Sequence, residues 1–116
     1  MEHRYIAAKQ QAIRSEPDLM EQIRNVINRR NYSRRTETSY THWIRRFIAF
    51  HDMSHPRTLG ASHIEAFLSY LATHKNVAAA TQNQALASIR FLYQEVLQIE
   101  APQLDQVVRA KKPKKL

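Results

Sequence analysis

The chain of 116 residues contains no cysteine and a single glycine. Without cysteine it can form no disulfide bond, thiolate metal site or thiol nucleophile, and it fits a reducing compartment. One glycine and four prolines are few for a β-rich protein with many tight turns, which indicates a helical chain. No apolar run approaches the roughly 18 residues of a membrane-spanning helix, and the N-terminus lacks the apolar core of a signal peptide. We therefore expect a cytoplasmic protein with no membrane partner.

Positive charge is plentiful and unevenly distributed along the sequence. The chain has 18 Lys and Arg against 10 Asp and Glu, a net charge of +8 at pH 7 and a pI near 10.2. Residues 24–46 hold seven basic side chains and one acid, and residues 109–116 hold five basic side chains and no acid. Between them, residues 47–108 hold three basic side chains and five acids. Clustered charge with a pI above roughly 9 is typical of nucleic-acid-binding domains and favours a binding surface over charge that only maintains solubility.

Apolar residues recur at helical spacing in four segments. These segments are residues 17–30, 34–51, 63–72 and 79–98. Asn31 is the expected stop of the first helix, and Ser33 should be the N-cap of the second. Ser62 and Glu65 form an S-x-x-E capping box that should open the third helix. Phe91 falls outside the apolar stripe of the fourth helix, so a neighbouring helix or a partner should cover it.

The fold class that follows is all-α, a compact bundle of four main helices. We expect the bundle to occupy residues 16–101. Residues 1–15 should be an N-terminal extension, disordered or weakly helical, because nothing in the sequence delimits a helix there. Residues 102–116 should be a basic linker that cannot fold alone. Four aromatic residues at helical spacing should lie in the core rather than serve as stacking platforms: Tyr32, Tyr40, Trp43 and Tyr93.

Metal-binding and catalytic patterns are weak in this sequence. His51 and His55 have the spacing of a helical ligand pair, but Pro56 interrupts the helix and no carboxylate cluster completes a site. We therefore expect surface histidines and no metal. A Gly-rich phosphate loop, paired carboxylates at useful spacing and a Ser/His/Asp motif are also missing. The sequence argues against catalysis by this chain, and against a cofactor or a small-molecule substrate.

The start of the second expected helix combines positive charge with hydroxyl groups. Arg34 and Arg35 lie in its first turn, where the helix dipole is already positive, and this placement should cost a few tenths of a kcal/mol each. The same polar face continues through Thr38, Thr41 and Arg45. A solvated polar face is the usual explanation of such a stripe, but it leaves the position of the arginines unexplained. A bound phosphate would offset the repulsion and use the free N–H groups, so we predict phosphate contacts here.

The fourth expected helix begins with small, uncharged hydrogen-bonding side chains: Thr81, Gln82, Asn83 and Gln84. Such residues at a helix start contact base edges or phosphates in DNA-binding domains. Taken alone, they are better explained as an ordinary polar cap; paired with a second positive helix start, they favour a DNA contact. The basic C-terminus, with Lys111 and Lys112, resembles a nuclear-localisation patch. A linker that lies along a phosphate backbone explains it equally well.

Several blocks of the sequence resemble the N-terminal core-binding, SAM-like domain of tyrosine recombinases, the phage-type integrases, and look most like integron integrases. The generic family pattern, Ser-x-x-Thr-x-x-x-Tyr with Phe further along, matches Ser33, Thr36, Tyr40 and Phe47. The more specific blocks are WIRRF at residues 43–47, His-Pro at 55–56, TQNQAL at 81–86 and FLY at 91–93. The resemblance covers about residues 19–116.

The resemblance implies a domain that holds one side of a recombination site, with its second and fourth helices toward the major groove. Its partners would be double-stranded DNA and other protomers of the recombinase, in the bacterial cytoplasm. The longer parent protein would break and rejoin DNA through a phosphotyrosine, using a C-terminal domain to which nothing here corresponds. This chain should therefore bind DNA without cutting it. Tyr40 and Tyr93 lie on apolar stripes and should not be the nucleophile.

A second function from another class remains open. The chain could be a helical protein–protein interaction module in which Phe91 and the first helix carry the contacts. This hypothesis predicts self-association or a partner complex that depends little on salt, together with negligible DNA binding.

Overall fold

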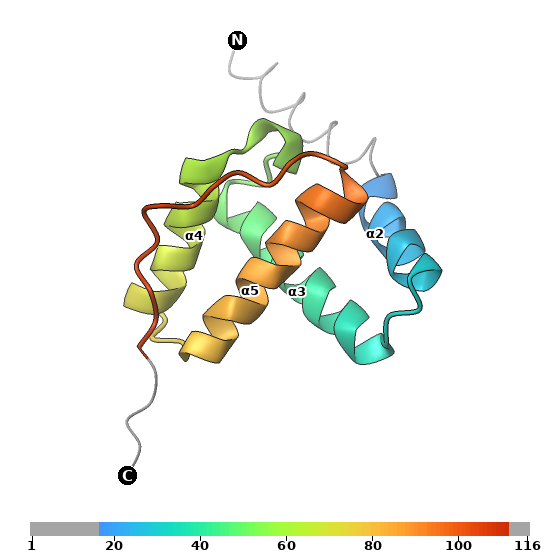
Figure 1. The fold of residues 1–116 in the computed structure, drawn as a ribbon. Helices are drawn as coiled ribbons and strands as arrows, with labels where there is room; N and C mark the ends of the chain where they lie inside the picture. Colours follow the sequence, from blue (N-terminus) through green and yellow to red (C-terminus); the bar gives the residue numbers. More distant parts are fainter. Residues whose placement is uncertain (1–16, 112–116) are drawn as a thin grey trace.

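Four α-helices make up most of the structure, a computed structural model that describes residues 17–111, with side chains from Leu19 onward (Figure 1). They are α2 (Pro17–Arg29), α3 (Arg34–Phe50), α4 (Ala61–Thr73) and α5 (Ala79–Phe91). A 3₁₀ turn (Pro56–Thr58) precedes α4, and a π-helical turn (Leu92–Val96) continues α5. Residues 17–111 contain no strand, and the prediction of an all-α fold with four main helices is confirmed. The extension expected at residues 1–15 and Lys112 lie outside the described residues.

The junction between α2 and α3 follows from local signals in the sequence. Asn31 adopts a left-handed conformation with φ of 56°, which asparagine tolerates and which commonly ends a helix. The Tyr32 N–H then donates to the Ile27 carbonyl at 3.1 Å and closes the last turn of α2. Ser33 caps α3, because its Oγ accepts the Thr36 N–H at 3.1 Å. The predicted stop at Asn31 and the predicted N-cap at Ser33 are both confirmed.

The start of α4 differs from the predicted capping box. The helix begins two residues earlier than Ser62 would allow, with Gly60 as its N-cap. The reciprocal contact comes from His63, whose Nδ1 accepts the Gly60 N–H at 3.0 Å. Ser62 is exposed in the first turn, and Glu65 accepts two backbone N–H groups from the C-terminal segment instead of one at the helix start. The capping-box prediction is wrong because a distant segment takes the carboxylate.

α5 and the turn that follows it cover nearly the predicted range. The last turn is π-helical, since the Leu97 N–H donates to the Leu92 carbonyl five residues earlier, at 2.9 Å. Gln98, with φ of 55°, ends the helical path. Tyr93 in this turn reaches across the bundle, where its hydroxyl donates to the Pro56 carbonyl at 2.6 Å. The wider turn ties the end of α5 to the loop before α4.

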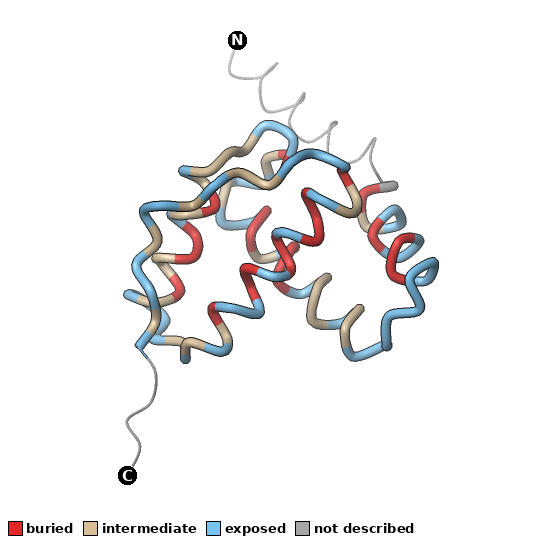
Figure 2. The backbone as a smooth tube through the Cα atoms, viewed as in Figure 1, coloured by how far each residue is buried: buried red, intermediate tan, exposed pale blue. Residues whose placement is uncertain are grey.

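The core is built from one face of each helix (Figure 2). Its most deeply buried members are Ile23 and Ile27 of α2, Ile44 and Phe47 of α3, Phe67, Leu68 and Leu71 of α4, Ala85 and Ile89 of α5, and Leu92 of the π-helical turn. Among the helices, α5 packs most extensively against α3. Trp43 and Tyr93 are buried, as predicted. No helix in the described part of the chain is both long enough and apolar enough to cross a membrane.

An aromatic cluster joins the start of α3 to α5. Phe91 is only 5% exposed, because its ring lies 4.6 Å from the ring of Tyr40 and 6.0 Å from that of Tyr32, centroid to centroid. The neighbouring helix α3 therefore covers Phe91. Tyr40 is half-buried in this cluster, whereas Tyr32 is 39% exposed. The expectation that Tyr32 lies in the core is wrong, since it sits in the turn between α2 and α3 at the margin of the cluster.

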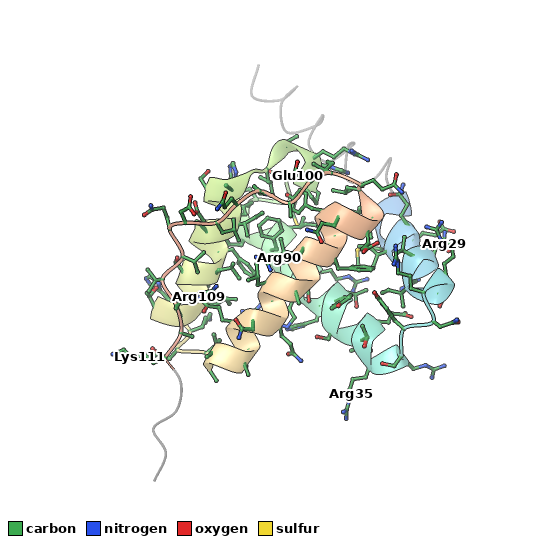
Figure 3. All side chains as sticks on the ribbon, in the orientation of Figure 1. Arg29, Arg35, Arg90, Glu100, Arg109 and Lys111 are labelled. Carbon is green, nitrogen blue, oxygen red and sulfur yellow. The ribbon has the colours of Figure 1, made fainter. Side chains whose placement is uncertain are left out.

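Residues 97–111 cross the end of α5 and then run beside α4 in an extended path (Figure 1). Leu104 and Val107 pack against the core along this path. The N-terminal ends of α3 and α5 lie at one edge of the bundle, and the segment ends near that edge at Lys111 (Figure 3). Glu100 lies at the opposite edge. The fold thus gathers two positive helix ends and a basic segment at the same edge.

Candidate nucleic-acid interface

The first two turns of α3 hold their threonine hydroxyl groups against the helix backbone. Thr38 Oγ1 donates to the Arg34 carbonyl at 3.0 Å, and Thr41 Oγ1 donates to the Glu37 carbonyl at 2.8 Å. Each hydroxyl has a single proton to donate, so neither can donate to a phosphate without releasing its present bond. The two threonines add polar surface without a ready donor. Contact with an anion is left to the arginines and to the backbone.

Three arginines of α3 project from the bundle. Arg34, Arg35 and Arg45 are exposed, and Figure 3 shows Arg35 extending from the start of the helix. Within residues 19–111 none of these three guanidinium groups forms an ion pair, whereas Arg30 on the preceding turn is paired with Glu95. The backbone N–H groups of Arg34 and Arg35 also have no acceptor in that part of the chain. Free N–H groups, a positive dipole end and unpaired cations are together the features of an anion site.

The start of α3 shares a groove with the second turn of α5. Arg34 and Arg35 line a shallow groove whose lining also includes Gln84 of α5. Ala78, the N-cap of α5, offers no side-chain acceptor, so the first N–H groups of this helix are uncapped. Thr81 in that turn is half-buried. The structure therefore places the exposed arginines at the start of α3 in one groove with Gln84 of α5.

Asn83 lines a second groove, together with Arg90 of α5 and Arg109 of the C-terminal segment. Sequence reasoning gave neither arginine a role. Arg90 could have been found, because it follows Asn83 by seven residues and so lies on the same face of the helix. Arg109 had no local signal, since only the path of the chain brings it to α5. Thr41 and Arg45, further along α3, line neither of these two grooves.

Gln82 does not lie at the surface, and the structure corrects its assignment to the interface. Its side chain is 1% exposed. Nε2 donates to the Leu68 carbonyl at 2.9 Å and to the Val108 carbonyl at 2.8 Å, and Oε1 accepts the Ala110 N–H at 2.9 Å. The amide is thus fully occupied inside the fold. A signal existed, because Gln82 precedes the buried Ala85 by three residues and shares its face of α5.

The C-terminal segment is fixed to the bundle rather than free. Three side chains accept hydrogen bonds from four of its backbone N–H groups: Glu65 Oε2 from Asp105 at 2.8 Å and Gln106 at 2.7 Å, Ser69 Oγ from Val108 at 2.9 Å, and Gln82 Oε1 from Ala110 at 2.9 Å. Arg109 and Lys111 remain exposed. The basic segment is therefore presented in one position at the edge where α5 begins. That it leads into a further domain stays a prediction.

Comparison with known proteins identifies a family with this architecture. Residues 19–103 match the family described as "Phage integrase, N-terminal SAM-like domain". The chain belongs to this family. Proteins described as "Integrase/recombinase" from Escherichia coli and Pseudomonas aeruginosa are each 44% identical to it over 98 residues. The aligned part covers 84% of this chain and 29% of each relative, so this SAM-like domain corresponds to less than a third of their length.

Two tyrosines of the SAM-like domain have hydroxyl groups that resist ionisation. Burial raises the pKa of Tyr93 to about 12, and its proton is already donated to the Pro56 carbonyl. Burial also raises the pKa of Tyr40, with a smaller contribution from the neighbouring Tyr32. A nucleophilic tyrosine must lose its proton. Both side chains are therefore suited to packing and hydrogen bonding rather than to attack on a phosphate.

The histidines of the SAM-like domain stabilise its loops. His51 Nε2 donates to the His63 carbonyl at 2.7 Å, and burial, as the largest cause, lowers the pKa of His51. His55 Nδ1 accepts the Arg57 N–H at 3.1 Å. His55 is only 8% exposed, so the expectation of surface histidines is wrong at this position, where the ring caps the 3₁₀ turn. Among residues 17–111 no group of three His, Asp or Glu side chains is placed to hold a metal ion.

Proposed function

We propose that this SAM-like domain binds double-stranded DNA at a recombination site, as the N-terminal part of a site-specific tyrosine recombinase of the integron type. One observation carries the proposal: the exposed arginines at the start of α3, which form no ion pair within residues 19–111, line one groove with the exposed Gln84 of α5. The sequence blocks at residues 43–47, 55–56 and 81–86 support the integron type. The place of action would be the bacterial cytoplasm, where such DNA lies.

Each part of the interface has a distinct role in this proposal. Arg34 and Arg35, with the free N–H groups of their turn, hold a backbone phosphate and so complete the start of α3. Asn83 and Gln84, exposed on α5, reach base edges or the backbone in the major groove, which is wide enough for a helix. Lys111 follows the phosphates at the edge of the bundle. Phosphate contacts fix the register of the domain, and any base contacts select the sequence.

The longer protein would supply the remaining chemistry. A C-terminal domain beyond this chain would break and rejoin the strand through a phosphotyrosine, and other protomers would assemble around the paired sites. The name given to the two relatives, integrase/recombinase, supports this assignment. The present domain would bind the DNA and fix its position, with the DNA held between this domain and the catalytic domain.

The proposal is tested by titrating the chain with duplex DNA at several salt concentrations. The variant Arg34→Ala/Arg35→Ala should bind more weakly, and its log–log salt slope should be shallower by about 1.8, since each phosphate contact contributes about 0.9. The matched control is Arg24→Ala/Arg57→Ala, which removes the same charge from exposed positions outside the groove. Equal losses in the two variants would mean that only net charge matters, and an unchanged slope in the first would reject the site.

The alternative function, a protein–protein interaction module, has lost part of its support. Phe91 was its expected contact, and that ring is covered by Tyr40. Phe50 and Met53 are exposed apolar side chains that such a module could still use. Self-association that persists at high salt, measured by sedimentation, combined with no binding to duplex DNA, would favour this alternative.

A further inference from the structure

The Gln82 side chain pairs with the C-terminal segment as a neighbouring strand would. Nε2 donates to the Val108 carbonyl and Oε1 accepts the Ala110 N–H, so one amide satisfies two backbone groups that flank a single residue. That residue is Arg109. Its backbone is therefore held from both sides, and a third bond from Nε2 to the Leu68 carbonyl fixes the amide itself to α4. A side chain that is 1% exposed thus determines where an exposed cation emerges.

The cation held in this way faces another one. Arg109 and Arg90 line the same groove along α5, and both are exposed. The groove lining includes one acid, Glu95, but that carboxylate is paired with Arg30. Within the described residues, the two guanidinium groups therefore have no acid of their own. Like charges that share a groove repel each other unless an anion lies between them.

We infer that Gln82 is a positioning residue that assembles a phosphate-binding site from Arg90 of α5 and Arg109 of the C-terminal segment. The ligand class is a backbone phosphate of duplex DNA, and this part of the inference rests on the proposed function. The site is separate from the groove at Arg34 and Arg35, which has no residue in common with it. Such a site would explain why Glu65, Ser69 and Gln82 hold the backbone of the segment beside α4 in one position.

The positioning half of the inference is tested without DNA, by hydrogen exchange of the backbone amides. In Gln82→Ala, the Ala110 amide and its neighbours should exchange at least tenfold faster, while amides inside α3 and α5 keep their protection. Gln84→Ala is the matched control. It removes the same kind of side-chain amide two residues further along α5, and the Gln84 side chain has no bond to the C-terminal segment. Unchanged exchange at Ala110 in Gln82→Ala would overturn the positioning role.

The binding half is tested by a double-mutant cycle in duplex titrations at several salt concentrations. Arg109→Ala should flatten the salt slope by about 0.9 in the wild-type background, and by less than half of that in the Gln82→Ala background. Gln22→Ala, exposed on α2, serves as the control background and should leave the effect of Arg109→Ala intact. An equal effect of Arg109→Ala in the Gln82→Ala and wild-type backgrounds would overturn the inference.

Two outcomes separate this inference from the proposed function. Absence of salt-dependent duplex binding by the wild-type chain would remove the proposed function and the phosphate site together, while the exchange result would still decide the role of Gln82. Duplex binding that depends on Arg34 and Arg35 but not on Arg109 would remove the phosphate site alone. Should Gln82→Ala fail to fold, Ser69→Ala releases only the Val108 N–H and should reduce the effect of Arg109→Ala in the same direction.

Discussion

α3 begins with a capped turn and α5 begins with an uncapped one. At the start of α3, Ser33 accepts the Thr36 N–H, and the arginines that follow project away from the bundle. At the start of α5, Ala78 offers no acceptor, and Gln82 one turn later is turned inward to hold the C-terminal segment. The two helix starts lie at the same edge of the bundle (Figure 1), yet the start of α3 is capped by its own residues and the start of α5 bonds to distant parts of the chain.

The difference between the two helix starts separates residues that stabilise the fold from residues that are available to bind a partner. The cap of α3 satisfies its own helix, so Arg34 and Arg35 have no structural duty within the described residues. The backbone N–H groups in the first turn of α5 are uncapped, and the side-chain amide of Gln82 in that turn is buried. Polar residues at a helix start are therefore not equivalent, and their neighbours in space decide which of them remain available to a partner.

The largest effect on folding should come from exchanging the two glutamines of α5 for alanine, one at a time. Gln82→Ala leaves the Val108 carbonyl and the Ala110 N–H without this partner and removes the bond to the Leu68 carbonyl, and should lower the free energy of unfolding by about 2 kcal/mol. Gln84→Ala removes an exposed amide and should change it by less than about 0.5 kcal/mol. Urea denaturation measures both. Similar losses in the two variants would erase the distinction between an inward and an outward glutamine.

A smaller effect should follow from exchanging the caps of the two helices. Ser33→Ala should lower the free energy of unfolding by about 1 kcal/mol, and Ala78→Ser should raise it by a similar amount. Ala78 already has the extended N-cap conformation, with φ of −69° and ψ of 158°. Ser62→Ala is the control and should be nearly neutral, since Ser62 is not the cap of α4. A loss at Ser62 as large as that at Ser33, seen in thermal or urea unfolding, would restore the capping box that the structure excludes.

Local signals predicted most of the fold, and long-range contacts account for the errors. The periodicity of apolar residues predicted four helices, and Asn31 and Ser33 marked their ends because each acts through neighbours three to five residues away. Glu65 and Gln82 were both misassigned for one reason. Each bonds the backbone of residues 105–110, and no pattern in the sequence shows that this segment returns to α4 and α5.

The candidate interface was predictable where its residues lie on a regular helix. Arg34 and Arg35 were found because their position conflicts with the helix dipole, a rule that needs only the helix start. Arg90 was accessible by the same kind of reasoning, from its spacing to Asn83 on α5. Arg109 was not, because its place in the groove depends on the path of an extended segment. Charge clustering predicted a binding surface, and only the tertiary structure shows that the candidate residues line two separate grooves.

The smallest effect, and the one with an unusual sign, concerns the arginines of α3 in the absence of DNA. If they repel the positive end of their own helix, Arg34→Ala/Arg35→Ala should raise the free energy of unfolding by a few tenths of a kcal/mol for each residue at low salt. The gain should shrink at high salt, because exposed charges are screened. Urea unfolding of the DNA-free chain at two salt concentrations measures this difference, with Arg24→Ala/Arg57→Ala as the control for net charge. A loss of stability would show that the arginines support the fold, and their position would then need no phosphate to explain it. A gain in stability, with weaker DNA binding by the same variant, would mean that the two arginines lower the stability of α3 in the free chain and that bound DNA offsets this cost.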